Sequence, residues 1–127
     1  MTRRWLSERA VPAVHAEQIA QHGGAPGLRD RALLESALAR PRNLAACGEP
    51  SVFRLAAAHG FGIARNHPFV GGNERTALVA AATFLLLNRY ELAAPEAEAV
   101  GVFLRLADGS VDEGALADWL ERSSVQG

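Results

Sequence analysis

The chain of 127 residues contains one cysteine, Cys47, and almost no excess of charge of either sign. A single thiol excludes an internal disulfide bond and is typical of a reducing compartment. The formal net charge of −1 provides no general electrostatic attraction to nucleic acid or to an anionic membrane. We therefore expect neither a direct nucleic-acid partner nor a membrane partner.

Long apolar stretches are missing as well. The first six residues do not form the apolar region of a signal peptide, because Ser7, Glu8 and Arg9 follow at once. The apolar segment at residues 77–87 is too short to span a bilayer. Without repeats or a low-complexity linker, the sequence predicts one cytoplasmic domain over residues 1–127, and 49% hydrophobic residues are enough to build its core.

Apolar periodicity predicts an all-α fold, a compact bundle of about six helices with no strand. The expected helices cover residues 7–21, 31–40, 52–65, 76–88, 95–107 and 110–122. The third and fourth are apolar on nearly all sides, so we expect them to be the buried centre of the bundle, with an active-site loop between them.

Local residue chemistry sets the expected helix boundaries. Asp30 and Ser51 are suitable N-caps, and Pro41 is expected to end the second helix. Ser110 and Glu113 match the spacing of a capping box at the start of the last helix. Residues 43–50 are expected to form a loop, and residues 123–127 to fray.

Three histidines lie outside the loop between the central helices, and for each we favour a structural role. We expect His15 and His22 to be solvated or partly buried on or beside the first helix. His59 is expected to be a hydrogen-bonded histidine of the core.

Chemically useful residues gather where the chain enters the apolar helix at residues 77–87. They are Arg65, His67, Gly71, Gly72, Asn73, Glu74 and Arg75. A helix N-terminus presents unpaired N–H groups and the positive end of the helix dipole, so it favours phosphate. This placement predicts an anion-binding site.

Five of these residues have a candidate role at such a site. Gly71 and Gly72 allow a ligand to approach the backbone closely, and Arg75 can hold a phosphate with its planar guanidinium. Asn73 can either cap the helix or donate its amide to an anion. His67 is the side chain suited to proton abstraction near neutral pH. We therefore expect transfer of a phosphate-containing group from a nucleotide to a hydroxyl, with His67 as the base.

Two further residues of this segment have simpler roles. Arg65 is either a second phosphate contact or an ordinary surface arginine. Phe69 is expected to anchor the loop in the core and to hold His67 still.

The same segment resembles the signature of the Fic/Doc family, H-x-F-x-[D/E]-G-N-x-x-R, and its shorter Doc form H-x-F-x-D-G-N-K-R-T-A. The matching residues are His67-Pro68-Phe69-Val70-Gly71-Gly72-Asn73-Glu74-Arg75, and Thr76-Ala77 after them favours the Doc branch. The Doc segment between the first two helices is similar to His22-Gly23-Gly24-Ala25-Pro26-Gly27-Leu28-Arg29-Asp30. The resemblance covers roughly residues 16–119.

This resemblance implies a fold, an activity and partners. It implies a toxin of a toxin–antitoxin pair, which uses ATP or another nucleoside triphosphate as donor and Mg²⁺ as the bridging metal. The Doc branch implies phosphorylation of elongation factor Tu, and the Fic branch implies AMP transfer. It also implies an antitoxin whose C-terminal helix fills a groove of the toxin.

The chain departs from the family signature at two positions. Gly71 stands where the family has an acidic metal ligand, and Glu74 stands where Doc proteins have lysine. One interpretation is that Glu74, three residues further on, has taken over as the metal ligand. The other is that metal and nucleotide binding are weakened. An enzyme with His67 as base and a Fic/Doc-fold binding module that acts through association therefore both remain hypotheses.

Overall fold

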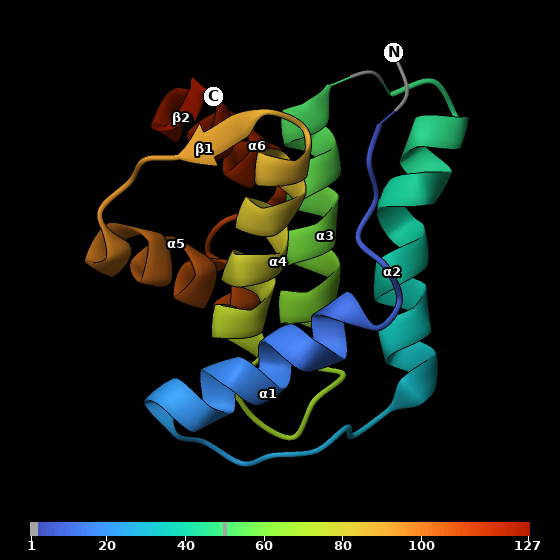
Figure 1. Cartoon of the computed structure of the whole chain (residues 1–127), viewed down its shortest axis with the longest axis vertical. Helices are drawn as coiled ribbons and strands as arrows, with labels where there is room; N and C mark the ends of the chain where they lie inside the picture. The colour runs from blue at the N-terminus through green and yellow to red at the C-terminus, as the bar shows by residue number, and fades with distance from the viewer. Residues whose placement is uncertain (1–2, 50) are drawn as a thin grey trace.

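The computed structural model describes residues 3–49 and 51–127, and these ranges form six helices and one small antiparallel sheet (Figure 1). The elements are α1 (Ala10–His22), α2 (Arg31–Ala46), α3 (Val52–Asn66), α4 (Asn73–Leu87), β1 (Tyr90–Leu92), α5 (Glu96–Asp108), α6 (Glu113–Ser123) and β2 (Ser124–Gln126). The expected bundle of about six helices is confirmed.

Helices α3 and α4 lie side by side at the centre (Figure 1). α2 covers one side of α3, α1 crosses one end of the pair, and α5 packs on the opposite side. Most residues of both central helices are buried, and many of them are alanine. Small side chains let the two helix axes approach closely, so the core is built around this pair.

Two glycines allow neighbouring helices to contact α3 directly. A Cβ atom on Gly62 would lie 3.0 Å from Cα of Ala37 in α2. A Cβ atom on Gly60 would lie 2.8 Å from Cε2 of Phe103 in α5. A Cβ atom would therefore be tightly crowded at Gly62 and would require Phe103 to shift at Gly60, so these positions affect how closely α2 and α5 pack on the central helix.

The C-terminal half of α2 differs from the sequence prediction. We expected Pro41 to end the second helix, but it lies inside α2, which continues to Ala46. Residues 43–46 are therefore helical rather than part of a loop. Pro41 is buried, and Leu44 and Ala45 pack against the core, so burial offsets the hydrogen bond that proline cannot donate.

The predicted caps were right for two helices and wrong for a third. The Asp30 carboxylate accepts a hydrogen bond from the Leu33 N–H, and the Ser51 hydroxyl accepts one from the Arg54 N–H. The predicted capping box at Ser110 was wrong. α6 begins after Asp112, whose carboxylate accepts from the Ala115 N–H at 2.8 Å.

The C-terminal residues also differ from the prediction. Residues 124–126 form β2, which pairs with β1 so that Tyr90 faces Gln126 and Leu92 faces Ser124. The N–H of Gly127 donates to the Arg89 carbonyl at 2.8 Å. The expectation of a frayed end without any strand was wrong, because backbone pairing with a distant segment satisfies these peptide groups.

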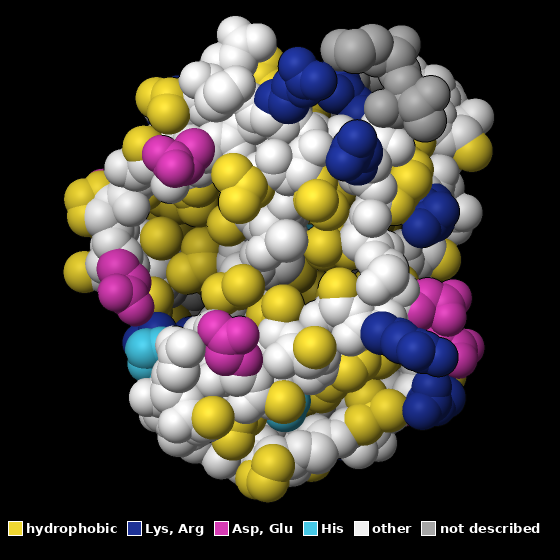
Figure 2. Space-filling view, in the orientation of Figure 1, with side chains coloured by type: hydrophobic (Ala, Val, Ile, Leu, Met, Phe, Trp, Pro, Cys, Tyr) yellow, Lys and Arg dark blue, Asp and Glu magenta, His cyan; other side chains and the backbone are white. Residues whose placement is uncertain are grey.

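The surface is mixed in character. In the described ranges, no helix has both the length and the apolar character needed to cross a bilayer. Figure 2 shows apolar side chains gathered in a hollow between α4 and α5, with arginine and acidic side chains distributed around it. Three leucines on these two helices are exposed, namely Leu86, Leu87 and Leu104.

His59 of α3 is buried, with 2% of its surface exposed, and its ring lies 4.7 Å from the Phe84 ring. We expected a hydrogen-bonded core histidine. Burial is confirmed, but neither ring nitrogen has a hydrogen-bond partner among the described residues. Burial, assisted by the positive charge of Arg42, lowers the pKa of His59 to about 4.

This lowered pKa predicts a loss of stability in acid. Between pH 6.5 and about 4 the unfolded chain binds a proton at this histidine and the folded chain does not. The free energy of unfolding should therefore fall by about 3 kcal/mol as the pH drops through this range. Urea unfolding of the wild type and of a His59→Phe variant near pH 7 and near pH 4 measures the difference.

The exposed His22 provides the control for this experiment. A His22→Gln variant should show the same decrease in the free energy of unfolding between pH 7 and pH 4 as the wild type. In His59→Phe this decrease should be smaller by about 3 kcal/mol. Equal acid sensitivity in all three proteins would show that His59 is not the responsible group.

Candidate active site

His67 lies at the sharp bend where α3 ends. It is the C-terminal cap of α3 and adopts the left-handed conformation, with φ 48° and ψ 57°, while its N–H donates to the Ile63 carbonyl at 3.2 Å. Histidine tolerates this region better than most residues, at a cost of about 1–3 kcal/mol. The bend leaves the imidazole exposed at the surface.

Arg29 holds the backbone on both sides of this bend. Its Nε donates to the His67 carbonyl at 2.7 Å, and its Nη2 donates to the Asn66 carbonyl at 3.0 Å. The N–H groups of Arg29 and Asp30 both donate to the Pro68 carbonyl. A charged donor on the last carbonyls of a helix stabilises its end. The two sequence segments that carry the family resemblance therefore meet in space.

The start of α4 is joined to the loop by a reciprocal pair of hydrogen bonds. The Phe69 N–H donates to Asn73 Oδ1, and Asn73 Nδ2 donates to the Phe69 carbonyl, both at 3.0 Å. Asn73 is 3% exposed and Phe69 is 2% exposed. The amide of Asn73 has one N–H left for an anion. Its predicted role in phosphate binding stays a prediction.

His15 is a residue of this site whose role the sequence did not reveal. Its ring stacks on the Phe69 ring, with centroids 3.9 Å apart, and its Nε2 lies 2.7 Å from the Gly71 carbonyl oxygen. A carbonyl accepts only, so Nε2 carries the hydrogen and donates it. His15 is buried, not solvated or partly buried as we expected. Its spacing from the buried Val11 and Gln18 is the signal that places it on the inner face of α1.

Gly71 is the position where the family has an acidic residue, and the structure gives a physical reason for glycine there. A Cβ atom on Gly71 would lie 3.0 Å from the Ala25 nitrogen and 3.3 Å from the Ala25 oxygen. Backbone atoms cannot move aside as a flexible side chain does, so an aspartate would require the 25–27 segment to shift. Gly72 follows as the N-cap of α4, in the left-handed conformation with φ 70°.

In the described chain, the three charged side chains predicted to bind phosphate or metal form no ion pair with one another. Arg75, on the first turn of α4, forms an ion pair with Glu96 of α5 at 3.4 Å. Arg65 is exposed, with its guanidinium carbon 5.3 Å from the centre of the Phe61 ring. Glu74 is half-buried, and its carboxylate has no hydrogen bond or ion pair with any residue that the structure describes.

The described residues contain no group of three His, Cys, Asp or Glu side chains placed to hold a metal ion. This arrangement is compatible with Mg²⁺ only where the ion is bound mainly by phosphate oxygens and water, with one or two carboxylates from the protein. Glu74 is the carboxylate on the first turn of α4, and no carboxylate is available at Gly71. Its role as a metal ligand stays a prediction.

Comparison with known proteins identifies the family to which this chain belongs. The sequence profile of the Fic/DOC family matches residues 5–85, and the chain belongs to this family. The match includes α1, the Arg29 segment, the His67 bend and nearly all of α4.

Two characterised relatives are similar to this chain. The protein kinase doc of Escherichia phage P1 is 30% identical over 120 residues, which cover 94% of each chain. The toxin Doc of Mycolicibacterium smegmatis is 45% identical over 74 residues, which cover 57% of each chain. Both lie in the Doc branch that the sequence motif favours.

The contacts of His15 lead to a prediction about the loop. A His15→Phe variant keeps a ring against Phe69 but leaves the Gly71 carbonyl without its donor. We expect the free energy of unfolding to fall by about 1–3 kcal/mol and the amides of residues 69–73 to exchange hydrogen faster. Urea unfolding and hydrogen exchange measure the two effects.

A matched His22→Phe variant changes an exposed histidine of the same helix and should alter neither quantity. Unchanged exchange at residues 69–73 in His15→Phe would contradict a role for the His15 hydrogen bond in holding the loop.

Proposed function

We propose that this protein is a Doc-like toxin of a toxin–antitoxin system, which transfers a phosphoryl group from a nucleoside triphosphate to a hydroxyl of a target protein. The observation that carries the proposal is the exposed imidazole of His67 on a backbone held by Arg29, next to the N-terminus of α4. The relative from phage P1 is named a protein kinase, which supports phosphoryl transfer.

His67 acts as the general base in this proposal. The target hydroxyl oxygen attacks the γ-phosphorus, the bond from that phosphorus to the bridging oxygen breaks, and the nucleoside diphosphate leaves. The hydroxyl proton passes to the imidazole. Most of the catalytic effect comes from positioning, so the fixed backbone around His67 is the contribution of the fold.

The N-terminal end of α4 supplies the anion site. The helix has no side-chain cap, so its first N–H groups are available to phosphate oxygens together with the Gly72 backbone and the remaining N–H of Asn73. Arg75 contributes its guanidinium, and Arg65 assists. The ion pair between Arg75 and the largely exposed Glu96 is weak, so a phosphate can displace it.

The donor is ATP or another nucleoside triphosphate. Glu74 is the carboxylate that would help to hold Mg²⁺, and the ion would supply positive charge against the phosphates. Because Glu74 precedes Arg75 on the same turn, it places negative charge where phosphate binds unless a cation intervenes. This makes nucleotide binding dependent on the metal.

Similarity to the Doc branch supports a proposal for the target and the inhibitor. We propose elongation factor Tu as the protein substrate, so that the modification stops translation in the cytoplasm; AMP transfer is the alternative reaction. The antitoxin restrains the enzyme by placing a C-terminal helix in a groove of the toxin.

One observation favours a second candidate function, a binding module of the same fold without efficient catalysis. Gly71 provides no metal ligand, and a Cβ atom at this position would require the Ala25 backbone to shift by a few tenths of an ångström. Such a protein acts through association with the antitoxin or another protein.

Replacement of the proposed base separates the two functions. Asparagine tolerates the left-handed conformation of residue 67 but cannot act as a base at neutral pH, so His67→Asn keeps the fold. For the enzyme, growth arrest on induction and transfer of labelled phosphate from ATP to elongation factor Tu should fall by about 10²-fold or more. Toxicity that persists unchanged in His67→Asn would favour the binding module.

Titration of ATP by calorimetry tests the anion site and the metal ligand. Binding in the presence of Mg²⁺ should weaken by about tenfold or more in Glu74→Ala, because the proposed protein ligand is lost. Glu91→Ala, an exposed carboxylate in β1, is the control and should bind like the wild type. Absence of ATP binding in every form, with or without Mg²⁺, would rule out nucleotide use.

A further inference from the structure

The peptide bond between Gly71 and Gly72 lies where the loop enters α4, and it is held from α1. That helix packs against α4 and crosses the loop that joins α3 to α4 (Figure 1). Nε2 of His15 donates to the Gly71 carbonyl oxygen at 2.7 Å. This is the one hydrogen bond that the Gly71–Gly72 peptide forms with the part of the chain that the structure describes.

Two nearby peptides are held by other groups. The peptide that joins residues 69 and 70 is bonded to the side chain of Asn73 and to the backbone of Gly27. The carbonyl of Gly72 accepts from the N–H and the hydroxyl of Thr76, at 3.1 Å and 2.8 Å. The peptide between the two glycines has no Cβ on either side to favour one orientation. Its orientation therefore depends on the donor in α1.

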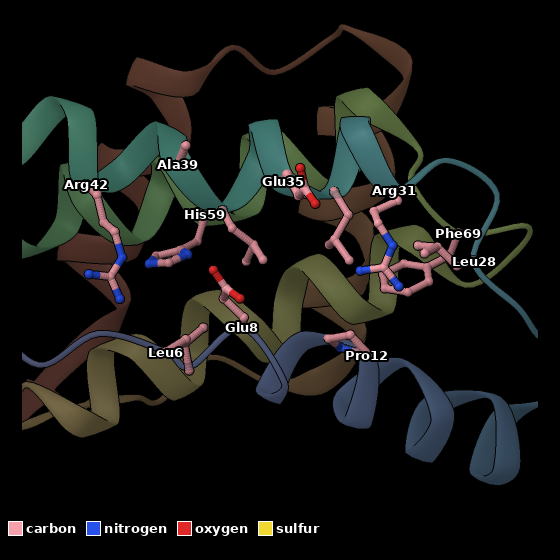
Figure 3. A pocket seen from close by; sticks show the side chains of 12 residues that line it. Leu6, Glu8, Pro12, Leu28, Arg31, Glu35, Ala39, Arg42, His59 and Phe69 are labelled. Atoms are coloured by element: carbon pink, nitrogen blue, oxygen red, sulfur yellow. The ribbon is translucent and has the colours of Figure 1, made fainter.

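This donor has little freedom of its own. His15 is 4% exposed, and its ring is stacked on the Phe69 ring with an angle of 7° between the planes. Phe69 pairs with Leu28 in an antiparallel bridge, and both residues lie at one end of a groove beside α2 (Figure 3). Packing on this side fixes the imidazole, so Nε2 meets the carbonyl at a defined position.

The direction of the Gly71 carbonyl decides where the Gly72 N–H points. The described residues contain no cis peptide bond, and a trans peptide directs its carbonyl and its N–H in opposite directions. The carbonyl faces His15, so the Gly72 N–H faces away from it.

The backbone that follows completes a concave anion site. Gly72 is left-handed, with φ 70° and ψ 21°, and Asn73 begins the helix. A left-handed residue followed by a helical one directs three successive N–H groups into one concavity, which favours anions. The N–H groups of Gly72, Asn73 and Glu74 donate to no group within residues 3–49 and 51–127.

We propose that His15 is a positioning residue of the phosphate site. Its hydrogen bond selects the orientation of the Gly71–Gly72 peptide in which the Gly72 N–H, and not the Gly71 carbonyl, faces the bound phosphate. In the reversed orientation one donor is lost, and the partial negative charge of a carbonyl oxygen faces the anion. The inference rests on the proposed function, in which the start of α4 binds the phosphates of a nucleoside triphosphate.

Two substitutions separate the donor of His15 from its ring. His15→Phe keeps a ring against Phe69 but cannot donate, so the unpaired Gly71 carbonyl should turn toward solvent. His15→Gln loses the ring, but its amide N–H can donate from nearly the position of Nε2. His22→Phe changes an exposed histidine of the same helix and is the control.

Titration of ATP with Mg²⁺ by calorimetry measures the effect on the phosphate site. Binding should weaken by about fivefold or more in His15→Phe, because the binding orientation of the peptide is then a minor population. It should change by less than about twofold in His15→Gln and in His22→Phe. A role in packing alone predicts the opposite order, because phenylalanine preserves the stacked ring and glutamine does not.

Two results of this titration would overturn the proposal. One is an affinity of His15→Phe for ATP equal to that of the wild type. The other is binding to His15→Gln that is as weak as binding to His15→Phe, or weaker.

Crystal structures of the unliganded wild type and His15→Phe test the peptide orientation directly. In His15→Phe we expect the Gly71 carbonyl to turn away from α1 and Gly72 to leave the left-handed region. An unchanged peptide in this variant would overturn the proposal, whatever the affinity for ATP. The structures need no nucleotide, so a wild type that binds no ATP would refute the proposed function, and the peptide in His15→Phe would still decide whether His15 selects its orientation.

Discussion

The contact between α3 and α4 is the constraint on which the rest of the structure depends. Most residues of both helices are buried, and alanine and glycine at their contacts allow α2 and α5 to pack closely on them. Two antiparallel helices held in this way fix the ends of the loop that joins them. The position of residues 67–72 is therefore decided by core packing, and the loop needs only short-range hydrogen bonds to adopt one conformation.

Those bonds come from three directions. Arg29 approaches from the segment before α2, His15 from α1 and Asn73 from α4, and each binds backbone atoms of the loop. The loop is thus held mainly through its peptide groups, which leaves the imidazole of His67 as an exposed side chain on a rigid support. Such an arrangement suits a group that transfers protons, because the reacting atom is accessible while its position is fixed. The left-handed backbone at His67 is the strained part of this arrangement.

Much of this could be predicted from the sequence, and the exceptions share a cause. The two central helices, the caps Asp30 and Ser51, and the loop at residues 67–72 follow from signals within a few residues of one another. Pro41 was misjudged because burial of the following turn outweighs a local propensity. β2 and the role of His15 depend on partners far away in the chain, which periodicity cannot indicate. The surroundings of position 71 are a similar case, because the backbone of Ala25, far away in the chain, lies where a Cβ atom on Gly71 would be placed.

Phe69 belongs to two parts of the molecule at once. Its ring lines a groove of about 460 Å³ beside α2 and stacks on His15, while its peptide group is bonded to Asn73 at the start of α4. A ligand in the groove that displaced the Phe69 ring would therefore also shift the peptide group bonded to Asn73, and its binding free energy would be linked to that of a ligand at the start of α4. Such linkage is reciprocal, so each ligand changes the affinity of the other by the same factor.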